Sequence, residues 1–393
     1  MSNANNSCIP RLRFPGFEGE WVEKKLGKVC LNEDNRRKPV SKTERILGQY
    51  PYYGANGIQD FVNGYIFDGE RLLVGEDGSV LTEENTPVVH WATGKFWVNN
   101  HAHVLSQKED DSLKYIYYVL STKKIAGLVT GIPPKLNQEN LNTIILPFPP
   151  VLFEQQKIAS CLSELDNLIV AQGQKVDALK EKKKGLMQQL FPQPGETTPR
   201  LRFPGFEGEW EEKKLGYSFD ERTEKNRGEL PLLSLGEEGL KLQSETARKD
   251  NSNADKSKYL RVAIGDIAYN TMRMWQGRCV CAKIEGIVSP AYTVCRPKNG
   301  IDSLFHYYLF KTQRMIQTFH KHSQGLVSDT LNLKFEAFSK IKYCLPPTFL
   351  EQQKIASSLS SLDDLIATES AKVEALKDHK KGLMQQLFPQ PTK

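Results

Sequence analysis

The chain has 393 residues and a mass of 44.6 kDa, which is too long for one ordinary domain and suggests two or three. With 39% hydrophobic and 25% charged residues, its composition is that of a folded protein and excludes a disordered or fibrous chain. The net charge of +6 permits a polyanionic partner such as nucleic acid but is far milder than that of a histone-like tail.

Neither a membrane anchor nor an export signal is predicted. The sequence has no run of about 18 apolar residues, and residues 1–10 lack the charged and apolar parts of a signal peptide. Seven cysteines scattered over the chain do not suggest a disulfide framework. We therefore expect a cytoplasmic protein with reduced thiols and no membrane contact.

The first recognisable element, RLRFPGFEGEW at residues 11–21, reveals a duplication because it returns unchanged at residues 200–210. A second block of 41 residues, which begins at Glu154, returns from Glu351 with 30 identities. The regions between these blocks share little beyond a KKLG start and a Pro-Pro pair near the end. A repeated frame therefore carries two diverged domains.

The first diverged region predicts a domain of mixed α and β structure. Its β-like runs include residues 71–74 and 88–91, and residues 112–122 are helix-like. Arg, Lys, Asn and similar side chains carry donors that match base edges in the major groove of DNA, although most such residues are simply solvated surface groups. The candidates for DNA contact in this region are Arg36, Arg37, Lys38, Asn56, Lys95, Asn99, Asn100 and His101.

A coiled-coil pattern follows from Glu154. Apolar residues recur at alternating intervals of four and three, with Gln172 and Lys183 as polar interruptions. A plain amphipathic helix would be the simpler interpretation, but duplication of the whole seam favours two helices that pair with each other. Pro192 cannot continue the helix, and residues 192–199 have the composition of a linker. The predicted seam residues are Ile158, Leu162, Leu165, Ile169, Val176, Leu179, Leu186 and Leu190.

The second half repeats this order with different contents. Its diverged region has β-like runs at residues 262–264 and 291–294 and a helical stretch at 303–318. In the second helix Glu369 and Lys380 are the polar interruptions. The candidates for DNA contact here are Arg222, Lys225, Asn226, Arg227, Asn270, Arg273, Gln276 and Arg278. The second set of seam residues is Ile355, Leu359, Leu362, Ile366, Val373, Leu376, Leu383 and Leu387.

The predicted fold class is α+β with an internal pseudo-twofold duplication. Two mixed domains are separated by two long helices that form an antiparallel coiled coil. A helix of about 35 residues is about 50 Å long, so antiparallel pairing would place the two domains at opposite ends. The predicted segments are 1–153 and 200–350 for the domains, 154–199 for the first helix with its linker, and 351–393 for the second helix.

No catalytic chemistry is predicted for this chain. It contains no GxxxxGK[ST] phosphate loop, no FxGxG cofactor motif and no carboxylate cluster typical of two-metal nucleases. The Pro-Pro pairs lack the flanking residues with which adenine methyltransferases hold a flipped base. The spacing of the following residues does not match the usual zinc sites, so we predict no metal: His101, His103, His320, His322, Cys279 and Cys281.

The whole chain resembles the specificity subunits of type I restriction and modification systems. The resemblance rests on the two variable regions separated by EQQKIA-type coiled-coil repeats. Further matching phrases are YYGANGIQDF, FDGERLLVGEDGS and GKFWVNNHAHVL in the first region, and GDIAYNTMRMWQG and VSPAYTV in the second.

This resemblance implies that each variable region is a target-recognition domain for one half of an asymmetric, bipartite site in double-stranded DNA. It also implies that the repeated helices dock two methyltransferase subunits, which modify the N6 of adenine. Separate restriction subunits would translocate and cleave DNA. S-adenosylmethionine, ATP and magnesium would bind those partners, and this chain would hold no cofactor.

Two other functions remain to be distinguished at this stage. A self-sufficient adenine methyltransferase would bind S-adenosylmethionine without a partner. A tethering protein, whose variable domains bind protein or sugar, would show no salt-dependent DNA binding in the presence of its partner subunit.

Overall fold

The computed structural model describes residues 9–108, 111–236, 239–246, 252–325 and 330–389. The chain divides into two compact units: residues 1–173 with 371–393 form unit 1, and residues 174–370 form unit 2. Each unit therefore combines one diverged domain with about half of each long helix. Among the described residues, no helix has both the length and the apolar character needed to cross a membrane.

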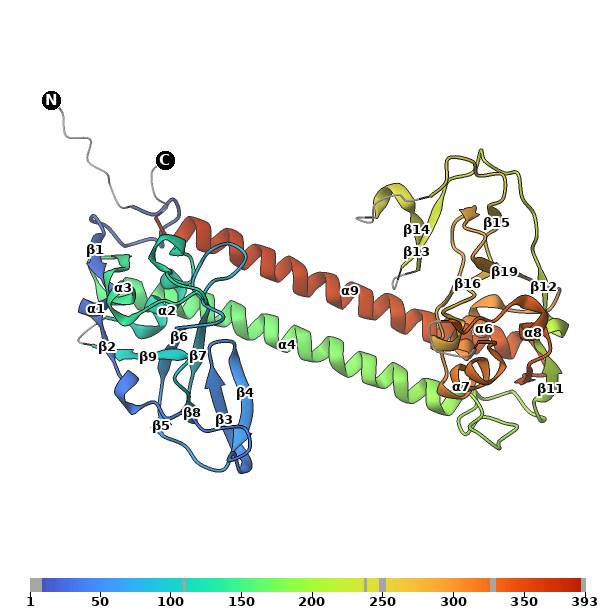
Figure 1. Cartoon of the computed structure of the whole chain (residues 1–393), viewed down its shortest axis with the longest axis horizontal. Coiled ribbons are helices and arrows are strands. Elements are labelled where there is room, and N and C mark those ends of the chain that lie inside the picture. The colour runs from blue at the N-terminus through green and yellow to red at the C-terminus, as the bar shows by residue number, and fades with distance from the viewer. Residues whose placement is uncertain (1–8, 109–110, 237–238, 247–251, 326–329, 390–393) are drawn as a thin grey trace. The chain divides into compact units, whose positions relative to one another are not determined.

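The two long helices are α4 (Leu152–Leu190) and α9 (Phe349–Leu387), shown in Figure 1. Both begin two residues before the predicted start. In unit 1 the first half of α4 pairs with the last half of α9, because Lys380 forms an ion pair with Asp166. In unit 2 the last half of α4 pairs with the first half of α9, through Lys183 and Asp363. The pairing within each unit is antiparallel.

The heptad positions face inward along this pairing. All sixteen predicted seam residues are buried or half-buried in the structure. The charged residues that interrupt the seam form ion pairs across it. Lys183 and Lys380 each pair with an aspartate, and the buried Glu369 pairs with Lys175 at 3.1 Å. Polar groups at a coiled-coil seam lower its stability but fix which residues face each other.

The diverged domain of unit 1 contains two small sheets. The first is antiparallel with strand order β2-β9-β6-β7, and the second has the order β4-β3-β8-β5, in which β3 and β8 run parallel. A pairing of β1 with β10 leads into α4. The bounds are β1 Val22–Lys25, β2 Cys30–Asn32, β3 Leu47–Gly54, β4 Gly57–Val62, β5 Phe67–Asp68, β6 Arg71–Gly75, β7 Val89–Ala92, β8 Lys95–Val98, β9 Ala102–Gln107, β10 Ile145–Phe148, α1 Leu26–Val29, α2 Leu113–Leu120 and α3 Gln138–Thr143.

The domain of unit 2 repeats the first sheet with strand order β12-β19-β16-β17. Three two-stranded pairings, β11-β20, β13-β14 and β15-β18, complete its β structure among the described residues. The bounds are β11 Glu211–Lys214, β12 Phe219–Glu221, β13 Leu233–Gly236, β14 Gly239–Leu242, β15 Leu260–Val262, β16 Ile267–Asn270, β17 Cys279–Cys281, β18 Gly286–Val288, β19 Tyr292–Pro297, β20 Lys342–Leu345, α5 Leu215–Ser218, α6 Ser303–Phe310, α7 Gln313–His322 and α8 Phe335–Ser339.

The fold class is confirmed, with one correction to the helices. The single helix predicted at residues 303–318 is two helices, α6 and α7, because the chain turns at Lys311 and restarts at Thr312. The Thr312 side chain caps α7 by accepting a hydrogen bond from the Met315 amide at 3.4 Å. A threonine three residues before an apolar helical position is a typical N-cap.

Each domain shares its hydrophobic core with the ends of both long helices. In unit 1, Ile158 and Leu162 of α4 and Phe388 after α9 pack in one cluster with Tyr115 and Phe148 of the domain. Unit 2 has an equivalent cluster, in which Leu190, Phe191, Ile355 and Leu359 meet Phe305. The helix ends are therefore part of each domain's core, so neither domain is complete without them.

Unit 2 contains a fully buried histidine in α6. His306 in α6 is fully buried; its Nδ1 donates to the Asp302 carbonyl at 2.8 Å, so its Nε2 accepts from the Tyr343 hydroxyl at 2.9 Å. Burial lowers the pKa of His306 from 6.5 to about 4, against a smaller opposing effect of the Asp302 carbonyl.

We therefore expect His306 to reduce stability as pH falls from about 6.5 to about 4, because the unfolded chain binds a proton there and the folded chain does not. The full effect is about 3 kcal/mol in the free energy of unfolding. Urea unfolding at pH 7.5 and pH 4.5 checks this. The variant His306→Asn should be less stable at pH 7.5 but lose less on acidification. Equal losses in both proteins would contradict the assignment.

Candidate DNA-recognition surface

The two domains place part of their candidate residues at the same edge of equivalent sheets. Helix α1 lies 189 residues before α5, and strand β2 lies 189 residues before β12. The sheet β2-β9-β6-β7 of unit 1 corresponds strand by strand to the sheet β12-β19-β16-β17 of unit 2. Strand β6 ends where Gly75 pairs with Ala102, and β16 ends where Asn270 pairs with Tyr292. The loops that follow β6 and β16, together with the turns that precede β9 and β19, therefore form one edge in each domain, here called the recognition edge.

In unit 1 two turns lie side by side at the recognition edge. The turn between β3 and β4 contains Asn56, and its Ala55 carbonyl contacts the His90 ring at 3.0 Å. The turn before β9 contains Asn99, whose amide donates to Gln59 of β4 at 3.3 Å. Asn99 is only 3% exposed, and its side-chain oxygen accepts from the His101 amide at 2.8 Å. Asn99 therefore shapes the turn, while its predicted neighbours Asn56, Asn100 and His101 are exposed.

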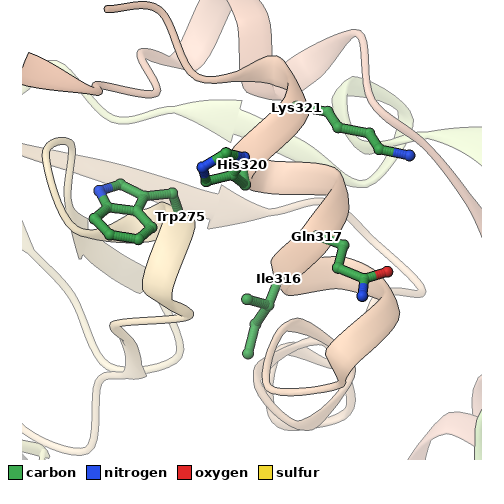
Figure 2. Close-up of a pocket in the computed structure, with 5 residues that line it drawn as sticks. All are labelled: Trp275, Ile316, Gln317, His320 and Lys321. Carbon is green, nitrogen blue, oxygen red and sulfur yellow. The ribbon is translucent and has the colours of Figure 1, made fainter. Parts of the chain in front are cut away.

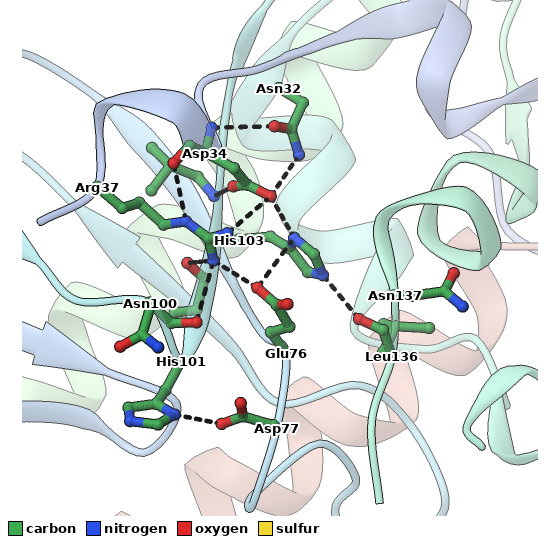
Figure 3. Close-up of polar contacts among 12 residues, drawn as sticks. Asn32, Asp34, Arg37, Glu76, Asp77, Asn100, His101, His103, Leu136 and Asn137 are labelled. Carbon is green, nitrogen blue, oxygen red and sulfur yellow. Dashed lines mark hydrogen bonds and ion pairs between the residues drawn. The ribbon is translucent and has the colours of Figure 1, made fainter. Parts of the chain in front are cut away.

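Arg37 does not have the position that the sequence suggested. Figure 3 shows its guanidinium in a polar network, paired with Glu76 and directed at the Ala102 carbonyl at 2.9 Å and the Asp34 carbonyl at 3.1 Å. Its side chain is 13% exposed. We therefore correct the prediction for Arg37: its donors hold the protein together beneath the recognition edge and are not available to DNA bases.

The same network contains a group of possible metal ligands. Donor atoms of Asp34, Glu76 and His103 lie within 4.8 Å of one another. Burial would raise the pKa of Asp34, but contacts with His103 outweigh it and lower that pKa. The negative charge of Glu76 is already balanced by ion pairs with Arg37 and, at 3.0 Å, with Lys135. A dication would compete with these two cations, so the residues fit an internal ion-pair network better than a metal site.

Of the remaining candidates of unit 1, Lys38 adjoins the turn before β9, because its amide donates to the Val98 carbonyl at 3.2 Å, whereas Lys95 lies away from the two turns. Lys95 begins β8, at the opposite end of that strand from Asn99, and lies 4.6 Å from the centre of the Tyr65 ring. Arg36 is exposed over the Phe67 ring at 4.6 Å. Lys38 is exposed, and its backbone accepts from the Trp97 indole at 2.6 Å. The structure therefore brings together only part of the predicted set.

In unit 2 Arg222 is also internal and is the second correction. Its guanidinium pairs with the buried Asp266 at 2.6 and 3.1 Å. The equivalent positions in unit 1 are Glu33 and Arg71, which pair at 2.8 Å with the charges reversed. The duplicated ion pair joins the segment after β2 or β12 to the start of the third sheet strand, so it is a structural bond in both domains.

The neighbouring candidates of unit 2 are more accessible. Lys225 and Asn226 are exposed, and Asn226 has the positive φ of 61° that asparagine tolerates in turns. Arg227 is half-buried and pairs with Glu224 and Glu229. Its charge is therefore already balanced by two carboxylates.

The loop after β16 carries three of the predicted residues. Met274 is fully buried, and the Trp275 indole donates to the Met272 carbonyl at 3.0 Å. Figure 2 shows Trp275 beside α7, where its ring lies 5.7 Å from the His320 ring, at a pocket of about 300 Å³. Arg273, Gln276 and Arg278 of this loop are exposed, and Met272 is 44% exposed.

A second pocket, of about 430 Å³, collects positive charge at this edge. It is lined by Asn270, Arg273 and Arg278, which the sequence indicated, and by Lys311 and Tyr307, which it did not. Burial raises the pKa of Tyr307 to about 12, so its hydroxyl stays a neutral donor. Within the described part of the chain, Arg273, Arg278 and Lys311 form no ion pair. A cluster of cations in a concave surface favours a polyanionic ligand.

Sequence reasoning also missed the anchors between each domain and the helices. Tyr118 donates to Asp166 at 2.7 Å in unit 1, and Tyr308 donates to Asp363 at 2.8 Å in unit 2. Each aspartate also binds a lysine of the other helix. A Tyr-Tyr pair at residues 117–118 and 307–308 was the available sequence indication, because little else is shared between the diverged regions.

The geometry defines a duplicated scaffold whose copies carry different polar surfaces at equivalent edges. Comparison with known proteins identifies the family: the model of the type I restriction modification DNA specificity domain matches residues 18–181 and again residues 209–378. The chain therefore belongs to this family and is a specificity subunit of a type I restriction-modification system. As such it acts with DNA and with other subunits.

Several relatives agree with this assignment. A putative type I specificity subunit of Haemophilus influenzae is 39% identical over 165 residues, which cover 42% of each chain. The MjaVIII specificity subunit of Methanocaldococcus jannaschii is 25% identical over 94% of this chain and 92% of its own. The crystal structure of a type I system S subunit from M. genitalium has a TM-score of 0.68 at 16% identity, over 98% of this chain and 100% of that one. This last likeness concerns the fold.

Proposed function

We propose that the chain reads an asymmetric, bipartite site in double-stranded DNA, one half with each diverged domain. The observation that carries this proposal is the difference between the two recognition edges. One presents Asn56, Asn100 and His101, whereas the other presents Arg273, Gln276 and Arg278 on the same sheet framework. Because amide and guanidinium groups match different base edges, the two edges favour different half-sites.

In this proposal the chain is not an enzyme but directs others to DNA in the cytoplasm. Two methyltransferase subunits with S-adenosylmethionine would modify the N6 of adenine in each half-site. Restriction subunits would supply ATP- and magnesium-dependent translocation and cleavage. Comparing the adenine methylation of a genome with and without this gene tests the role: loss of one split, asymmetric motif supports it, and an unchanged pattern contradicts it.

We expect the double variant Arg273→Ala, Arg278→Ala to weaken DNA binding by the methyltransferase complex about 10- to 100-fold, because it removes two cations that form no ion pair with the described residues. If both arginines contact phosphates, the slope of log K against log salt should fall by about two. If they contact bases, discrimination should relax in one half-site only. Fluorescence anisotropy at several salt concentrations separates these cases.

A matched control is Lys342→Ala. This lysine is exposed in β20, outside the recognition edge, and pairs with Glu212 at 2.6 Å. It should bind DNA like the wild type. Equal affinity of the double variant and the wild type would show that this loop is not part of the DNA interface.

A further inference from the structure

The recognition edge of unit 1 carries an ion pair between Asp77 and His101, which is shown in Figure 3. Asp77 lies in the loop after β6, and His101 lies in the turn before β9. The contact joins a carboxylate oxygen of Asp77 to Nδ1 of the His101 ring. The other ring nitrogen, Nε2, has no hydrogen-bond partner within the described residues, and 48% of the His101 side chain is exposed. Nε2 is therefore available to a ligand at this edge.

Unit 2 has an equivalent turn in which two apolar residues replace the ion pair. His101 directly precedes β9, and Ala291 directly precedes the equivalent strand β19. Asp77 lies two residues after the end of β6, and Met272 lies two residues after the end of the equivalent strand β16. Because Met272 and Ala291 cannot form an ion pair, the two recognition edges differ at this point although their sheets correspond.

The backbone of both turns is held by the same hydrogen bonds. In unit 1 the Asn99 side chain accepts from the His101 amide at 2.8 Å, and the His101 carbonyl accepts from an amide of the loop after β6 at 2.9 Å. In unit 2 the Ser289 hydroxyl accepts from the Ala291 amide at 3.3 Å, and the Ala291 carbonyl accepts from an amide of the loop after β16 at 3.1 Å. Because unit 2 forms this turn with apolar residues at both positions, the turn does not require an Asp–His pair. A partly exposed ion pair also adds little to stability.

The contact with Asp77 determines which nitrogen of the His101 ring carries the proton. A carboxylate only accepts hydrogen bonds, so Nδ1 must donate to it. A neutral imidazole has a single N–H, and Nε2 is then left with a lone pair. The backbone of His101 is held on both sides, and its ring is held by Asp77. Nε2 is therefore a hydrogen-bond acceptor at a fixed place on the recognition edge.

We propose that His101 reads the exocyclic amino group of one base pair, on cytosine or adenine, and that Asp77 is the residue that positions it. This inference rests on the proposed function and adds the chemistry of one contact in one half-site. In the major groove the amino groups of cytosine and adenine are the hydrogen-bond donors, whereas guanine and thymine present acceptors there. An acceptor at Nε2 therefore favours an amino group at the place it faces and disfavours the oxygen of guanine or thymine.

The test uses the full chain assembled with its methyltransferase subunits. Long-read sequencing first determines the motif that the wild-type complex methylates. The variant His101→Ala should relax one base pair in one half-site and leave the other half-site unchanged. The double variant Asp77→Met, His101→Ala copies the corresponding residues of unit 2, so it should remain folded in thermal melting and show the same relaxation.

Duplexes that lack the amino group at the relaxed base pair test the chemistry of the contact. They carry purine in place of adenine, or pyrimidin-2-one in place of cytosine. In fluorescence anisotropy the wild-type complex should bind such a duplex about 3- to 10-fold more weakly than the complete one, and His101→Ala should lose most of this preference. Glu70→Gln is the matched control, because it removes an exposed carboxylate directly before β6, and it should keep the wild-type preference.

The variant Asp77→Asn tests the positioning role. Its amide can donate to Nδ1 of His101, which places the proton on Nε2, as replacement of an aspartate beside a histidine does in serine proteases. The ring would then donate, so the preference should shift towards a base that presents an acceptor. Nitrogen NMR of the His101 ring should report the change of tautomer. A merely structural role of Asp77 would lower the affinity for all duplexes by the same factor and would leave the preference unchanged.

Each outcome decides a different point. If the wild-type complex methylates no split motif, the proposed function fails and this inference fails with it. If it methylates one, and His101→Ala reads the same motif with the same preference, the function stands and His101 is not a base-reading residue. If the preference of the wild type depends on an acceptor of guanine or thymine instead of an amino group, the His101 ring donates and the inference is overturned.

Discussion

Inserting four residues into each long helix, after Gln172 in α4 and after Glu369 in α9, should lengthen the spacer between the two half-sites by about one or two base pairs. Four helical residues add about 6 Å, and base pairs are about 3.4 Å apart. The four inserted residues also rotate one end of the helix relative to the other by about 40° beyond a full turn. This angle lies between the rotations produced by one and two base pairs of B-DNA. The bases read in each half-site should not change, because the recognition edges are untouched.

The insertion points fall at the border between the two units. The pair Asp166–Lys380 stays within unit 1, and the pair Lys183–Asp363 stays within unit 2. The longer helices can therefore keep both sets of pairs. Methylation motifs determined by long-read sequencing would report the new spacer. Retention of the original spacer by a folded, active variant would show that helix length does not set the distance.

Insertion into only one helix is the matched control. The additional residues would have no counterpart, so the seam and the aspartate–lysine pairs of one unit would lose their register. This variant should lose stability and methylation together. If it instead behaved like the double insertion, the pairing of α4 with α9 would not determine the spacing.

The helices could be predicted from the sequence because their pattern is local. The alternation of four and three needs only the neighbouring residues, and duplication of the seam indicated a partner helix within the same chain. The break between α6 and α7 was missed because both flanking segments are helix-like. Thr312 was the relevant residue, since its hydroxyl caps the second helix.

The recognition residues were less predictable because their roles depend on distant partners. Arg37 and Arg222 looked like DNA contacts by residue type, but each pairs with a carboxylate about 40 residues further along the chain, Glu76 and Asp266. Conversely, Lys311 lies in a helical context in the sequence, and only the fold brings it into the pocket with Arg273 and Arg278. Residue type suggests what a side chain can bind; tertiary partners determine whether it is free to do so.

Replacing residues 22–152 with the corresponding region of another specificity subunit should change one half of the target and leave the other half unchanged. The two recognition edges belong to different compact units, and each is built on its own sheet. A change confined to one unit therefore alters one set of base contacts. Methylation motifs of the hybrid would provide the measurement, and the reciprocal replacement of residues 211–350 should change the opposite half.

The shared core sets a condition on this experiment. Tyr115 and Phe148 of the replaced region pack against Ile158 and Leu162 of α4, and Tyr118 binds Asp166. A donor region with smaller residues at the two aromatic positions would leave a cavity against the helix, with a cost of about 3–5 kcal/mol for each lost phenylalanine-sized side chain. Donors that keep these residues should give stable hybrids. If such a folded hybrid changed both half-sites, the two edges would not read DNA independently, and the specificity would have to arise from the two units acting together.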